Sequence, residues 1–211
     1  MIRILIVDDH PLILEGLRSR LERAPDIKII GEARDGDEAL TRARADRPDI
    51  LVLDISLPGK SGLEVLRLLH AELPMVRVLI LSTHPEIEYV DRSLSLGAWG
   101  YLTKNGPSEE LLEAIRTVNR GHKYVGSVLV QNLATEDRET RHRFPHEALS
   151  DREFQILCLL GQGKTLTQIA ESLSISTSTV GTHRARILGK MNLNTTAELV
   201  KYAVEHKLVD F

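Results

Sequence analysis

Three aspartates stand directly after short apolar runs in the first part of the chain. Asp8 and Asp9 follow the run 4–7, and Asp54 follows the run 50–53. Short apolar runs without polar alternation predict strands buried on both faces of a parallel sheet. Ligands bind at the carboxyl ends of such strands, so we expect the three carboxylates to meet at one sheet edge. Because they repel one another there, they favour a hard divalent cation, and we expect Mg²⁺.

Two more polar side chains follow later strands of the same expected sheet. Asp54 is a candidate nucleophile, because carboxylates can attack phosphorus and form an acyl phosphate. That product adds roughly 1.5 to 2 negative charges, so the site also needs a cation and a hydrogen-bond donor. Lys104, just after 100–102, can supply the positive charge. Ser82, which ends the apolar run 78–81, can supply the hydroxyl.

The elements that would position these groups alternate between strands and helices. The expected strands cover residues 3–7, 27–31, 50–53, 77–81 and 99–102. The expected helices lie between them at about 12–23, 36–46, 61–72, 86–96 and 108–120. Such repeats predict an α/β fold, a (βα)5 doubly wound parallel sheet with helices on both faces. In the strand order 2-1-3-4-5 the first and third strands are neighbours, which brings the aspartates together.

The C-terminal part predicts an all-α domain of four helices. Residues 123–147 read as a linker, because their end is polar, charged and contains Pro145, with one short helix at 127–134 as an option. Helices are then expected within 148–211, at about 151–161, 166–173, 177–190 and 196–206. Their capping signals are Ser150 with Glu153, Thr165 with Gln168, Ser176 with Thr179 as a partial match, and Thr195 with Glu198. The short link between the second and third predicts a helix-turn-helix.

Composition and charge narrow the class of protein. A chain of 211 residues suits two domains. The start shows no signal peptide, and no apolar run approaches the roughly 20 residues that span a bilayer, so we expect a cytoplasmic protein without a membrane partner. The single cysteine, Cys158, lies in an apolar helical stretch and is expected in the core.

Charge is distributed unevenly along the chain. Residues 1–122 hold 16 basic and 20 acidic residues, whereas residues 148–211 hold 7 and 6. The basic groups of the second part are concentrated, because Arg184, Arg186 and Lys190 fall within one expected helix. A local basic stripe of this kind favours nucleic acid as a partner.

Taken together, these motifs resemble two known domains. The segments that resemble a receiver domain are Asp8-Asp9-His10-Pro11, Asp54 to Pro58 with Gly62, Ser82, and Gly100 to Lys104. Those that resemble a LuxR-type helix-turn-helix are Leu149 to Glu153, Gly163-Lys164, Ile169-Ala170, Ile175-Ser176, Thr179-Val180 and His183. Over essentially its whole length, the chain resembles response regulators of the NarL/FixJ family.

The resemblance implies a role for each polar residue of the expected site. Asp54 would accept the phosphoryl group, and Lys104 would bind one of its oxygens. Ser82 and Tyr101 would form a switch pair, in which the hydroxyl turns toward the phosphoryl group and the ring moves into the vacated space. For His10 a positioning role is favoured over direct chemistry. The groups that would hold Mg²⁺ are Asp8, Asp9, Asp54 and the backbone carbonyl of Ser56.

The third helix of the C-terminal domain is the expected DNA-reading element, because the second helix of a helix-turn-helix enters the major groove. Arg184 and Lys190 are expected to contact phosphates rather than bases. Gly181 stands where the family commonly has lysine or another polar residue, and Leu166-Thr167 where it has Asn-Lys. We therefore expect weaker phosphate anchoring, a shallower salt dependence and more reliance on dimerisation. The residues left to face DNA are Ser178, Thr179, Thr182, His183 and Arg186.

The expected function is that of a transcription factor rather than an enzyme. A sensor histidine kinase would phosphorylate Asp54, and a homodimer would bind double-stranded promoter DNA, with RNA polymerase as a further candidate partner. Two alternatives stay open. An aspartate-nucleophile phosphatase normally needs a second acid two residues after the nucleophile, where this chain has Ser56. An orphan regulator that never cycles phosphate would not need the full set of acids with Ser82 and Lys104.

Overall fold

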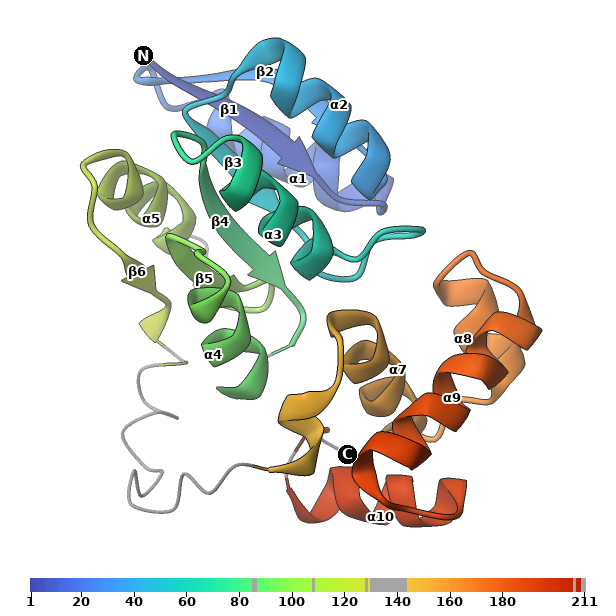
Figure 1. The fold of residues 1–211 in the computed structure, drawn as a ribbon. Coiled ribbons are helices and arrows are strands. Elements are labelled where there is room, and N and C mark those ends of the chain that lie inside the picture. Colours follow the sequence, from blue (N-terminus) through green and yellow to red (C-terminus); the bar gives the residue numbers. More distant parts are fainter. Residues whose placement is uncertain (85–86, 108, 128, 130–143, 207, 210–211) are drawn as a thin grey trace. The chain divides into compact units, whose positions relative to one another are not determined.

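The computed structural model describes residues 1–84, 87–107, 109–127, 129, 144–206 and 208–209 (Figure 1). The chain divides into two compact units, Met1–Glu136 and Asp137–Phe211. Most of the expected linker, and most of the optional helix at 127–134, lies outside the described residues. Each unit is described by itself.

The first unit is built on one parallel sheet with the strand order β2-β1-β3-β4-β5-β6. This order confirms the predicted arrangement 2-1-3-4-5 and adds a short strand at the edge. That strand, β6, pairs with β5. Its residues were predicted as part of the linker, because a strand of two residues gives no periodic pattern in the sequence. The strands are β1 (Ile2–Val7), β2 (Ile27–Ala33), β3 (Ile50–Leu53), β4 (Arg77–Ser82), β5 (Gly100–Thr103) and β6 (Tyr124–Val125).

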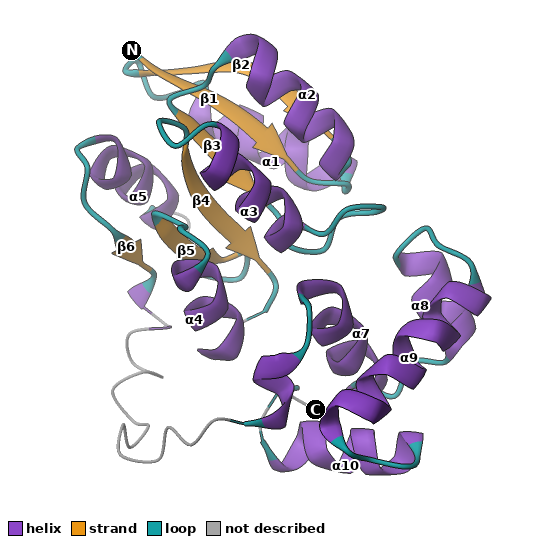
Figure 2. Ribbon diagram, viewed as in Figure 1, coloured by secondary structure: helices purple, strands orange, loops and turns teal. Residues whose placement is uncertain are grey.

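Helices connect the strands and cover both faces of the sheet (Figure 2). Their ends lie within about two residues of the prediction, which is the usual uncertainty at helix ends. The helices are α1 (Pro11–Leu21), α2 (Gly36–Asp46), α3 (Gly62–Glu72), α4 (Ile87–Ser95) and α5 (Glu110–Asn119).

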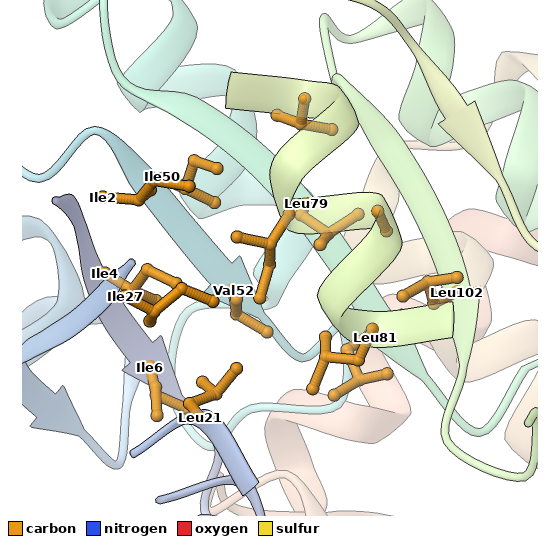
Figure 3. Packing of buried hydrophobic residues seen from close by; sticks show 14 of the residues in the cluster. Ile2, Ile4, Ile6, Leu21, Ile27, Ile50, Val52, Leu79, Leu81 and Leu102 are labelled. Atoms are coloured by element: carbon orange, nitrogen blue, oxygen red, sulfur yellow. The ribbon is translucent and has the colours of Figure 1, made fainter. Parts of the chain in front are cut away.

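The strands that carry the acids are held by apolar packing on both sides. Successive side chains of a strand point to opposite faces, and all residues of β1 except Arg3 are buried. One set, which includes Ile4 and Ile6, packs with Leu14 of α1 and Ile115 of α5 in a continuous cluster (Figure 3). Each such side chain contributes roughly 1.5–3 kcal/mol on burial. The strand ends, and the residues that follow them, are therefore firmly placed.

The second unit is helical in its described residues. Its elements are η2 (Pro145–Ala148), α7 (Asp151–Gly161), α8 (Leu166–Ser172), α9 (Thr177–Met191) and α10 (Thr196–Glu205). Full capping boxes begin α7, α8 and α10, and Ser176 caps α9 without the reciprocal bond, as predicted. Cys158 is buried, which confirms its expected place in the core. Among the helices that the structure describes, none has the length and apolar character needed to cross a membrane.

Two glycines differ in the space around them, Gly62 in the first unit and Gly181 in the second. A Cβ built on Gly62 would lie 2.0 Å from the backbone oxygen of Asp54, so the turn after β3 can close only without a side chain. A Cβ on Gly181 in α9 would meet nothing within 4 Å.

We expect Gly62→Ala to destabilise the first unit by about 1–3 kcal/mol, because the clash forces the backbone beside Asp54 to move. Gly181→Ala should instead stabilise α9 by about 0.5–1 kcal/mol, because it removes the entropic cost of glycine in a helix. Thermal unfolding of both variants and the wild type measures this. Equal effects of the two substitutions would contradict the packing described here.

Candidate functional site

The sheet brings two of the predicted acids side by side. Val7 at the end of β1 is paired with Leu53 at the end of β3, and the amide of Asp54 donates to the carbonyl of Val7 over 3.0 Å. Asp8 and Asp54 are therefore neighbours, and they are only 1% and 2% exposed. The neighbouring strands fix their spacing, as the alternation of strands and helices predicts.

Lys104 joins both buried carboxylates. Its Nζ lies 2.8 Å from Oδ2 of Asp54 and 2.6 Å from Oδ2 of Asp8. The amide of Lys104 also donates to the carbonyl of Ser82 over 2.7 Å, which fixes the loop after β5 against the end of β4. The residue predicted to supply positive charge thus lies at hydrogen-bond distance from the predicted nucleophile.

The charges of this cluster do not balance. Burial raises the pKa of Asp54, and Asp8 adds to the rise, while Lys104 opposes it. Burial would lower the pKa of Lys104, but Asp54 and Asp8 outweigh it and raise that pKa, so the ammonium form is kept. With Asp9 beside them, three carboxylates face one lysine among the described residues of this cluster. The imbalance favours a further cation.

The donor set fits a divalent metal ion such as Mg²⁺. Ligand atoms of Asp8, Asp9, His10 and Asp54 all lie within 4.8 Å of one another. Oδ1 of Asp54 is buried and has no hydrogen-bond partner among the described residues. A buried carboxylate oxygen without a partner is costly, and an oxygen-rich cluster is what hard cations prefer. The residues present therefore fit the expected ion.

A second group of contacts surrounds the predicted switch pair. Ser82 and Tyr101 are both 0% exposed. The hydroxyl of Tyr101 donates to the carbonyl of His84 over 2.7 Å, and the amide of His84 donates to Oγ of Ser82 over 3.2 Å. The His84 ring stacks on Tyr89, and its Nε2 lies 3.2 Å from Oγ of Ser56. His84 thus contacts both members of the pair and the loop after β3.

The structure adds Tyr89 to the surroundings of the site, a residue that the sequence analysis did not include. The ring of Tyr89, in α4, is buried and supports His84. Nothing in its local sequence separates it from an ordinary core residue. The position of His84 two residues after Ser82 was the available signal, since it places the backbone of His84 near the end of β4.

Most of the predicted DNA-facing residues are exposed on the surface of α9. On the inner side of α9, Val180, Ile187 and Met191 are buried and Leu188 is partly buried. The hydroxyls of Ser178 and Thr179 cluster around Oγ of the capping Ser176, at 2.8 and 2.7 Å. The residues that remain exposed are Ser178, Thr179, Thr182 and Arg186, and His183 and Arg184 are partly buried.

Lys190 lies in a different setting from the one expected. Its Nζ is 2.6 Å from Oε2 of Glu153, a carboxylate that also accepts the amide of Ser150 in the cap of α7. Burial would raise the pKa of Glu153, but the bonds from Lys190 and Ser150 outweigh it and lower that pKa. Lys190 therefore links α9 to the start of α7. Arg152 links the start of α7 to the end of α8, because it donates to the carbonyl of Leu173 over 3.1 Å.

Comparison with known proteins agrees with the two units. Residues 4–116 match the response regulator receiver domain, and residues 147–203 match the bacterial regulatory proteins of the LuxR family. The chain is 35% identical to the response regulator UvrY of Escherichia coli K12, over 99% of this chain and 96% of UvrY. It is 34% identical to the response regulator GacA of Pseudomonas aeruginosa, over 100% and 99% of the two chains.

Solved structures show the same folds. A LuxR-family two-component response regulator from Aurantimonas is 35% identical and covers 64% of this chain and 96% of its own, with a TM-score of 0.62. RcsB of Salmonella enterica bound to the promoter rprA has a TM-score of 0.66 over 95% of this chain and 97% of its own, at 22% identity, which shows the fold alone. The chain therefore belongs to the NarL/FixJ family of two-component response regulators, transcription regulators with a receiver domain and a LuxR-type DNA-binding domain.

Proposed function

We propose that this response regulator accepts a phosphoryl group on Asp54 from a sensor histidine kinase in the cytoplasm. The observation that carries the proposal is the ion pair between Lys104 and the two buried acids, Asp8 and Asp54. The ion pair places the positive charge of Lys104 beside Oδ2 of Asp54, next to the position that the phosphoryl group would take. The family membership of the chain supports the same assignment.

In the proposed step, a carboxylate oxygen of Asp54 forms a bond to phosphorus while the bond to the donor's histidine nitrogen breaks. That nitrogen keeps the electron pair of the broken bond. Lys104 can move from carboxylate to phosphoryl oxygen over a short distance, because its Nζ is already 2.8 Å from Asp54. Mg²⁺ would offset the negative charge of the phosphoryl group. The groups proposed to hold it are Asp8, Asp9, Asp54 and the backbone carbonyl of Ser56.

The proposed response begins at Ser82. If its hydroxyl turns toward the phosphoryl group, the bond from the amide of His84 to Ser82 changes, since that bond ends on the same oxygen. The carbonyl of His84 holds the hydroxyl of Tyr101. A shift of the backbone at His84 therefore reaches Tyr101 through one residue. Phosphorylation would in this way shift the balance between two preexisting conformations.

The proposed output is binding of promoter DNA by a homodimer, with RNA polymerase as a further partner. Solved structures of RcsB, which shares this fold, include two dimers bound to two parallel DNAs. Two copies would read two half-sites. Ser178, Thr179, Thr182 and Arg186 are exposed for base contacts. His183 and Arg184 are partly buried, and because Nδ1 of His183 and Nε of Arg184 are themselves buried, any contact to phosphate oxygens would come from their other ring and guanidinium nitrogens.

We expect Asp54→Asn to abolish uptake of a phosphoryl group from a small acyl-phosphate donor with Mg²⁺, because the amide is not a nucleophile. Intact-mass spectrometry of the full chain measures the uptake. Asp37→Asn is the matched control, since Asp37 is an exposed acid paired with Lys60. Equal labelling of Asp54→Asn and the wild type would refute the assignment, and rapid turnover without stable label would favour the phosphatase alternative.

Replacement of Gly181 by lysine should strengthen DNA binding and steepen its salt dependence by about one unit of log–log slope, because one more phosphate contact forms. Gly181 is close to the start of α9 and has open space around it. Gly189→Lys is the control, since this position is equally open but lies near the end of the helix. A salt titration of promoter binding measures both slopes. If the two lysines act alike, the effect is general charge and Gly181 is not at the interface.

Lys190→Ala should lower the stability of the second unit by about 1.5–3 kcal/mol, because it leaves the buried carboxylate of Glu153 without its charged partner. Lys201→Ala is the control, since the pair of Lys201 with Glu205 is exposed and contributes little. Thermal unfolding measures stability, and a binding assay below the unfolding range measures DNA affinity. Unchanged stability together with weaker DNA binding would restore Lys190 to the role of a phosphate contact.

A further inference from the structure

The side chain of His10 lies within the acidic cluster. Its Nδ1 is 2.7 Å from Oδ1 of Asp9 and 3.2 Å from Oδ1 of Asp8. The imidazole nitrogen thus lies between two of the carboxylates proposed to hold a cation. Four potential ligand groups, three carboxylates and one imidazole, share this small volume.

The local backbone leaves the ring of His10 without a structural task in α1. His10 is the N-cap residue of α1, yet its side chain makes no capping hydrogen bond, and Pro11 begins the helix. The backbone amide of His10 donates to Oδ1 of Asp8 over 2.9 Å, which fixes the main chain beside the acids. The side chain of His10 is 63% exposed, and the ring contacts it makes with described residues are those of Nδ1 with Asp8 and Asp9.

The number of acids is not the only sign that the cluster lacks positive charge, because two further observations point the same way. Asp54 is 2% exposed, and its Oδ1 has no hydrogen-bond partner among the described residues. Lys104 contacts Oδ2 of Asp54 and Oδ2 of Asp8, which leaves Oδ1 of both acids on the other side. Oδ1 of Asp8 is the atom that faces His10. The imidazole nitrogen therefore approaches the side of the cluster that Lys104 does not neutralise.

We propose that His10 is a ligand of the divalent cation at this site, so that the site binds first-row transition ions such as Co²⁺ and Mn²⁺ with a nitrogen ligand that Mg²⁺ uses poorly. The proposal rests on the proposed function of the acids as a metal site. It replaces the positioning role that the sequence favoured for His10.

The chemistry of the donors gives the direction of the preference. Carboxylate and carbonyl oxygens suit Mg²⁺ and Mn²⁺, whereas imidazole favours later first-row ions. The signature of ligation by His10 is therefore a loss of Co²⁺ affinity relative to Mg²⁺ when the imidazole is removed.

The experiment compares the full-length wild type with His10→Ala and His10→Asn. Asn can still hydrogen-bond to the carboxylate of Asp9 but has no imidazole nitrogen, so it separates ligation from positioning. Calorimetric titration with Co²⁺ and with Mg²⁺ gives the affinity ratio of each protein. Pulsed electron paramagnetic resonance of bound Mn²⁺ detects coupling to a ligating nitrogen. His122→Ala is the control for metal binding by an exposed histidine.

We expect the ratio of Co²⁺ to Mg²⁺ affinity to fall about tenfold in both His10 variants, comparable with the loss of one well-placed group at a metal site. Nitrogen coupling should be present in the wild type and in His122→Ala and absent in both His10 variants. An unchanged ratio in His10→Ala, a wild-type ratio in His10→Asn, or no nitrogen coupling in the wild type would each overturn the proposal. Labelling of Asp54 in the wild type tests the proposed function separately, since it requires no transition ion.

Discussion

The whole arrangement depends on the placement of two carboxylates where water hardly reaches them. Asp8 and Asp54 follow the paired ends of β1 and β3 and share one lysine. Like charges interact strongly away from water, so the cluster has a standing affinity for added positive charge. The same fields make added negative charge on Asp54 costly unless Lys104 and a metal ion accompany it. This charge imbalance is the property on which the proposed response to phosphorylation of Asp54 depends.

The contacts beyond the acids give this electrostatic site a mechanical connection. His84 contacts Ser82 and Tyr101 through its backbone and Ser56 through its ring. Ser82 and Tyr101 stand on the neighbouring strands β4 and β5, and Lys104 follows β5 directly. The groups near the charge and the groups proposed to move are therefore held by one sheet. In the second unit, the bond between Lys190 and Glu153 holds α9 by a comparable contact between distant parts of the sequence.

Much of the fold followed from local patterns. The apolar runs predicted the strands because their burial on both faces needs no knowledge of the partner, and the caps predicted the helix starts because the bonds span three residues. Contacts between residues far apart were not predictable in this way. Lys190 and Glu153 are 37 residues apart, and the sequence offered a phosphate contact as the simpler interpretation. The ring position of His10 depends on the rotation of its side chain, which the spacing of residues does not predict. Strand β6 is too short to show a periodic pattern.

The exposed residues of α9 fall into two groups that differ in how freely they can be substituted, because some of them also cap the helix. Ser176, Ser178 and Thr179 share one hydroxyl cluster, so a substitution in Ser178 or Thr179 alters both the surface and the start of the helix. Arg186 is exposed and lies outside that hydroxyl cluster. Among relatives that recognise different sequences, change at Arg186 should therefore be common, whereas the first turn should change only as a set.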